Sequence, residues 1–98
     1  MRGRRLWCND AGEFFTDHAM SQKVPGYAWQ PQEGDYWQYD GDWYAKAPNG
    51  LRCGLRGHAV VENADHTITV SPSILVTGCD GVDKTWHGFL VDGVWREA

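Results

Sequence analysis

The chain has no long hydrophobic run. Its longest apolar stretches are fragments such as residues 73–76 and 89–91, whereas a membrane-spanning helix needs roughly 18–20 apolar residues. The basic N-terminal residues are not followed by the apolar stretch of about 7–15 residues that a secretion signal contains. We therefore expect no contact with a membrane, no export by that route and a cytoplasmic location.

Cysteine is also scarce. Three cysteines are an odd number and too few for a small scaffold held together by disulfides. This count favours reduced thiols, which agrees with a cytoplasmic compartment.

Positive charge is in deficit, with nine Lys and Arg against 13 Asp and Glu and a net charge of −4. Binding to a phosphate backbone needs a clustered basic surface that releases counterions, so the balance disfavours nucleic acid as a partner. A nucleic-acid-binding module remains an alternative, with an aromatic platform and five arginines as its contacts: Arg2, Arg4, Arg5, Arg52 and Arg56.

What the sequence does have is a large aromatic content. Six Trp, four Tyr and three Phe occur among 98 residues, and in one small domain such side chains supply much of the buried surface. Hydrophobic residues are 42% and charged residues 22% of the chain, which is typical of a folded protein. Most of the aromatic side chains are therefore expected in the core.

Two Asp-Gly pairs, each between β-prone segments, predict hairpins with two-residue turns. The Asp92-Gly93 turn would place Val91 opposite Val94 and Leu90 opposite Trp95, with both faces buried. The Asp40-Gly41 turn would place Trp37 opposite Tyr44 and Gln38 opposite Trp43.

A third hairpin is predicted from residues 58–63 and 66–71. With a two-residue turn at Ala64-Asp65, one face would carry Ala59, Val61, Ile68 and Val70. Ala-Asp is a poor turn of this kind, and a longer loop through Asn63 would change the register. Residues 74–76 indicate a buried strand, and residues 51–57 a loop or bulged strand.

The N-terminal segment has a different pattern. Asp10 with Glu13 resembles a capping box, which predicts a short helix ending near Val24. The expected organisation is an N-terminal segment over residues 1–24, short and helical or irregular, and a β-rich domain over residues 25–98. The fold class is mainly β: a small antiparallel sheet or partly open barrel of about five to seven strands.

Three motifs carry a resemblance to a known family: WYAKAPNGLRCGLRGHAVVE, TITVSPSI and WHGFLVDGVWREA. In order and spacing they resemble a family of small actinobacterial phage and prophage proteins, over residues 25–98. The resemblance implies a phage accessory protein in the host cytoplasm. Because the family has no established activity, it implies no site residues.

A zinc ion takes Cys and His ligands in a tetrahedron, and the chain offers one such set: Cys53, His58, Cys79 and His87. These residues form two pairs in glycine-containing corners, so zinc is a candidate cofactor, although buried free Cys and ordinary hydrogen-bonded His are the simpler explanation. A zinc-dependent or Cys-based enzyme is the corresponding alternative function, with Cys53 beside His58 or Cys79 beside His87. No established catalytic motif supports it.

The hypothesis that we favour is a non-catalytic module that binds a host or phage protein. Its contact residues would be the aromatic side chains of the central hairpin, Trp37, Tyr39, Trp43 and Tyr44. Neighbouring acids such as Asp40 and Asp42 would suit a basic partner. Exposed edge strands of an open sheet would also allow a homodimer.

Overall fold

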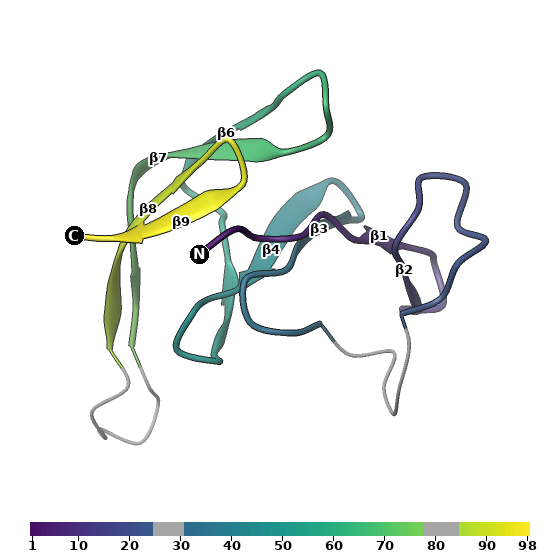
Figure 1. Ribbon diagram of the computed structural model, residues 1–98, viewed down its shortest axis with the longest axis horizontal. Coiled ribbons are helices and arrows are strands. Elements are labelled where there is room, and N and C mark those ends of the chain that lie inside the picture. The colour runs from purple at the N-terminus through teal and green to yellow at the C-terminus, as the bar shows by residue number, and fades with distance from the viewer. Residues whose placement is uncertain (25–30, 78–84) are drawn as a thin grey trace.

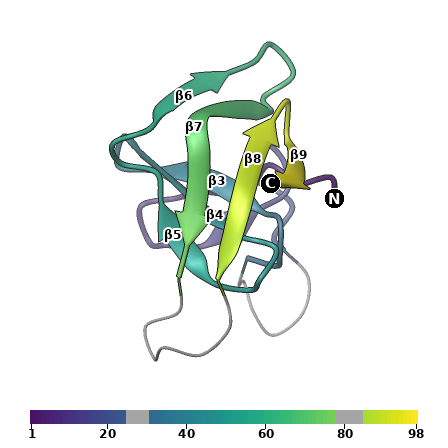
Figure 2. The same ribbon diagram turned by 90° about the vertical axis from the view of Figure 1, so that its left-hand side faces the viewer.

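The computed structural model describes residues 1–24, 31–77 and 85–98. Over these ranges the protein is mainly β, as predicted, with nine strands in three antiparallel sheets and no closed barrel. The sheets have the orders β1-β2, β3-β4-β5 and β6-β7-β8-β9 (Figures 1 and 2). Their strands are β1 (Trp7–Cys8), β2 (Phe14–Phe15), β3 (Tyr36–Tyr39), β4 (Asp42–Lys46), β5 (Arg52–Gly54), β6 (Ala59–Glu62), β7 (Ile68–Val76), β8 (Trp86–Val91) and β9 (Val94–Glu97).

The C-terminal hairpin has the predicted turn and register. Asp92 and Gly93 both have positive φ, at 50° and 74°, and Leu90 pairs with Trp95. Burial on both faces was wrong, because β8 alternates: Leu90 is buried, whereas Phe89 and Val91 are each 44% exposed. The four-stranded sheet packs on the core through one face only.

The β6-β7 hairpin uses the longer of the two predicted loops. Asn63 N–H donates to the Thr67 carbonyl, and Glu62 pairs with Ile68, so the two-residue register was wrong. His66 is the last residue of the three-residue loop and has a φ of 70°, which is a left-handed conformation. A two-residue turn at Ala64-Asp65 would not include this residue. The change turns Val61 outward, where it is 58% exposed.

Strand β7 is bent between its two halves (Figure 2). Its pairing with β8 shifts register between Val70 and Ile74, so a bulge accompanies the bend. Beyond it, Ile74 and Val76 are buried and Leu75 is 62% exposed.

The central hairpin also has its predicted register, with Trp37 opposite Tyr44 and Gln38 opposite Trp43. The segment predicted as a loop or bulged strand provides β5, which pairs Cys53 with Ala45. The result is a three-stranded sheet whose two faces carry different sets of side chains, because side chains alternate along each strand.

The helix predicted after Asp10 is wrong, because this segment forms the β1-β2 hairpin. The polar contacts resemble a helix cap, but Asn9 makes them: its Oδ1 accepts the Glu13 N–H at 2.9 Å and its Nδ2 donates to Glu13 Oε1 at 3.0 Å. Phe14 and Phe15 are both buried, and consecutive side chains point to opposite sides of a strand rather than along one helix face.

Residues 1–6 connect the two larger sheets, and we call them the N-terminal strap. Trp95 N–H donates to the Met1 carbonyl, and Gly3 N–H donates to the Gly93 carbonyl. At the other end of the strap, Tyr36 N–H donates to the Arg4 carbonyl. In Figure 1 the strap runs from beside β9 toward β3.

Two groups of buried side chains form the core. The larger lies between the four-stranded sheet and one face of the three-stranded sheet, and it includes Trp95, Trp86 and Tyr36. The smaller lies on the other face of the three-stranded sheet and contains Leu6, Phe14, Val24 and Trp37. No helix long and apolar enough to cross a membrane is found in the parts of the chain that the structure describes.

The strap passes so close to the core that Gly3 has no room for a side chain. A Cβ there would lie 2.4 Å from the Gly34 carbonyl oxygen and 2.9 Å from Trp95 Nε1. We expect Gly3→Ala to lower the free energy of unfolding by about 3 kcal/mol through overpacking. Urea unfolding measures this, with Gly54→Ala as control, since a Cβ at Gly54 makes only ordinary contacts at 3.8 Å. Equal effects of the two substitutions would contradict the tight crossing.

An ion pair between the partly exposed Arg4 and the buried carboxylate of Asp35 also holds the strap. Asp35 is 3% exposed and accepts from Arg4 Nε at 3.2 Å, from Arg4 Nη2 at 2.9 Å and from the Gln32 N–H at 2.7 Å. Asp35→Ala leaves the Gln32 N–H and the partly exposed Arg4 guanidinium without their common acceptor and should cost about 2 kcal/mol of unfolding free energy. The exposed pair of Asp42 with Arg56 is the control, because Asp42→Ala should cost less than about 1 kcal/mol. A loss of that small size for Asp35→Ala would refute the role of the pair.

Candidate binding groove

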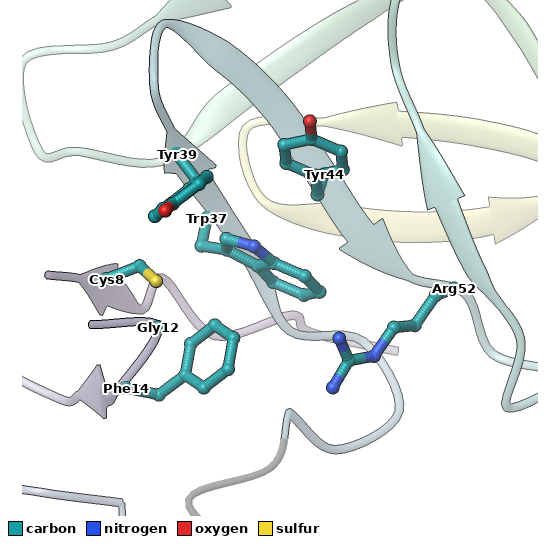
Figure 3. Close-up of a pocket in the computed structure, with 7 residues that line it drawn as sticks. All are labelled: Cys8, Gly12, Phe14, Trp37, Tyr39, Tyr44 and Arg52. Atoms are coloured by element: carbon teal, nitrogen blue, oxygen red, sulfur yellow. The ribbon is translucent and has the colours of Figure 1, made fainter. Parts of the chain in front are cut away.

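A groove of about 550 Å³ lies beside the three-stranded sheet, on the face away from the larger core. Its lining comes from the N-terminal hairpin and all three strands: Cys8, Gly12, Phe14, Trp37, Tyr39, Tyr44 and Arg52 (Figure 3). Seven residues from distant parts of the chain thus meet at one surface.

Strand alternation explains which aromatic side chains face the groove. Trp37 and Tyr39 are two residues apart on β3 and share a face. Tyr44 is directly opposite Trp37 on β4, and Gly54 opposite Tyr44 leaves its ring uncovered by a side chain from β5. Arg52, two residues before Gly54, faces the same side.

The rings form an ordered stack. The Trp37 and Tyr44 centroids are 6.1 Å apart with planes inclined by 19°, and Phe14 meets Trp37 edge to face at 5.2 Å. Trp37 is only 4% exposed and forms the floor, whereas Tyr39 at the rim is 38% exposed. Its hydroxyl donates to the Asp10 carbonyl at 3.3 Å, which holds the ring in place.

The positively charged Arg52 side chain lies at one end of the groove (Figure 3). The Arg52 guanidinium carbon is 5.6 Å from the Trp37 centroid and 6.0 Å from the Phe14 centroid, within the range of a cation–π contact. Figure 3 shows Arg52 at one end, and Cys8 with Tyr39 at the other. Burial raises the pKa of the Cys8 thiol, and the charge of Arg52 opposes this only in part.

The structure brings together three of the four predicted contact residues. Trp43 lies on the opposite face of β4, where it packs against the larger core and under the Arg5 guanidinium at 4.8 Å. Sequence reasoning missed Phe14, and it named Arg52 only for the nucleic-acid alternative. Arg52 could have been found by extending the predicted register of β4 to a third strand, but Phe14 was assigned to a helix.

The predicted zinc ligands have other partners where the structure describes them. His58 Nε2 lies 3.3 Å from the Ser73 carbonyl, and His87 Nε2 lies 3.0 Å from the Ser73 hydroxyl. Cys53 packs against the larger core, and Cys79 lies outside the described residues. Within residues 1–24, 31–77 and 85–98, no three His, Cys, Asp or Glu side chains form a metal-binding group.

Comparison of the chain with protein-family models, with curated proteins and with solved structures finds no match in any of the three. The groove must therefore be interpreted from its own chemistry.

Burial raises the pKa of the Cys53 thiol to about 11. Because the thiolate is the reactive form, Cys53 should remain unmodified by iodoacetamide at neutral pH in the folded protein and react readily in guanidinium chloride. Peptide mapping by mass spectrometry separates Cys53 from the other cysteines. Folded-state labelling of Cys53 as fast as in the denatured chain would contradict its burial. As pH rises from about 9, the ordinary pKa of a cysteine thiol, toward about 11, the thiol of the unfolded chain ionises before that of the folded chain, so the free energy of unfolding falls.

Proposed function

We propose that the protein is a non-catalytic interaction module that binds a segment of a host or phage protein in the groove. The observation that carries the proposal is the stack of Trp37 and Tyr44 with Arg52 at its end. Aromatic and Arg side chains at the centre of a concave surface are typical of the residues that contribute most to protein binding.

The charges indicate which segment fits. Of the acids expected to attract a basic partner, Asp42 forms an ion pair with Arg56 within the protein. The Arg52 guanidinium lies at the groove beside the Trp37 and Phe14 rings, where it can take a carboxylate of the ligand in addition to its contacts within the protein. We therefore propose a ligand segment with an apolar or aromatic side chain followed by a carboxylate, which would lie against Tyr39 and Tyr44 and pair with Arg52.

The alternatives have less support. Three of the five arginines proposed for nucleic-acid binding form ion pairs with Asp35, Glu62 and Asp42. These pairs reduce the positive charge offered to a phosphate backbone. For Cys-based catalysis, burial raises the pKa of the Cys53 thiol, which disfavours the nucleophilic thiolate.

Short capped peptides test the proposal directly. One set carries Trp, Tyr, Leu or Pro next to Glu, and a matched set carries Lys in place of Glu. We expect the full chain to bind the acidic set better, and Tyr39→Ala to weaken binding roughly five- to thirtyfold, equivalent to about 1–2 kcal/mol. Fluorescence polarisation with labelled peptides measures both effects.

The control is Phe89→Ala, because Phe89 is 44% exposed on the outer face of the four-stranded sheet and does not line the groove. Binding should be unchanged in this variant. Failure of both peptide sets to bind, or equal loss in the two variants, would refute the groove as the interaction site.

A further inference from the structure

A second hollow, of about 510 Å³, lies where the N-terminal hairpin meets the β6-β7 loop. Two imidazoles lie next to each other there with their planes inclined by 49°, His18 from the loop that follows β2 and His66 from the β6-β7 loop. Trp7 contacts both rings at centroid distances of 5.7 Å. This cluster takes no part in the groove or in the predicted zinc set.

The distance between the two imidazole rings matches that of two imidazoles bound to one metal ion. Their centroids are 5.1 Å apart. Two imidazoles bound to one tetrahedral ion, with metal–nitrogen bonds of about 2.0–2.1 Å, have centroids roughly 5 Å apart. The observed centroid separation therefore suits two rings that each bind a common ion through one nitrogen.

A carboxylate orients one of the rings. Glu62 Oε2 lies 3.2 Å from His66 Nδ1, and the same oxygen accepts from Arg5 Nη1 at 2.5 Å. When His66 Nδ1–H donates to Glu62, its Nε2 is left as the metal ligand. A carboxylate bound to the far nitrogen of a histidine is the common outer-shell arrangement at metal sites.

The loops that carry the two rings are held by their own contacts. His66 closes its hairpin at a φ of 70°. Asp17, next to His18, accepts from the Ser21 N–H at 2.9 Å and from the Gln22 N–H at 2.7 Å. A partly fixed pair of ligands loses less conformational freedom when it binds an ion.

We propose that His18 and His66 form a two-imidazole site for a divalent late transition-metal ion, with Zn²⁺ as the reference ion. Water completes the coordination, and the hollow gives it room. The ion joins the loop that follows β2 to the β6-β7 loop. Imidazole suits Zn²⁺, Ni²⁺ and Cu²⁺ better than Mg²⁺ or Ca²⁺, so the site discriminates against the last two.

Calorimetric titration of the untagged full chain with ZnCl2 tests the site. The wild-type protein should bind Zn²⁺ and not Mg²⁺, and His18→Ala and His66→Ala should each weaken Zn²⁺ binding at least tenfold. His87→Ala is the matched control, because His87 is an exposed histidine that belongs to the other predicted set. It should bind Zn²⁺ as the wild type does. Circular dichroism spectra verify that each variant is folded.

Quenching of tryptophan fluorescence by CuCl2 gives a second readout, since Trp7 contacts both rings. Trp7→Phe should keep calorimetric Cu²⁺ binding and lose most of the quenching. The site is refuted if wild-type protein binds no Zn²⁺ up to about 1 mM, or if His18→Ala and His66→Ala bind as wild type. Loss of binding in His87→Ala alone would place the ion at the other histidines and also overturn the proposal.

Discussion

The fold depends on a hydrogen bond at the centre of the molecule, from Trp95 Nε1 to the Gly34 carbonyl at 2.9 Å. Trp95 belongs to the four-stranded sheet, whereas Gly34 precedes the three-stranded sheet, so this bond ties the two together. The strap crosses directly over it at Gly3, where only hydrogen fits. An unmade bond here would leave a buried carbonyl without a partner, at a cost of about 1–3 kcal/mol.

Because the strap and Trp95 fix one face of the three-stranded sheet, the other face is left for the N-terminal hairpin. That hairpin is short, with two residues in each strand, and it covers only part of the face. Leu6 and Phe14 fill the space over Trp37, while Tyr44 stays half-buried and Tyr39 exposed. Among the residues that the structure describes, the groove is thus the part of an aromatic sheet face that the covering hairpin does not bury.

How far the sequence predicts this structure depends on how local the interactions are. The two Asp-Gly turns fix their own registers through positive φ at adjacent residues, and both were predicted. That register already separates Trp43 from Trp37 by face, which the sequence analysis did not use. Burial was harder to predict, because the exposure of Phe89 and Val91 depends on what packs against the sheet.

The N-terminal hairpin was missed because Asn9 and Glu13 make contacts that a helix cap also makes. Only packing on Leu6 and Trp37 distinguishes the hairpin from a helix.

The groove and the histidine cluster share strand β1. Cys8 lines both hollows, and its neighbour Trp7 contacts His18 and His66. Arg5, at the end of the strap, pairs with Glu62 and stacks on Trp7 and Trp43, so it links β1 to the β4 face opposite the groove. A short two-stranded hairpin has little stability of its own, and its position rests on such contacts. His18 lies in the loop that follows β2, so anything that holds His18 against His66 also restrains the strand whose Phe14 packs on Trp37.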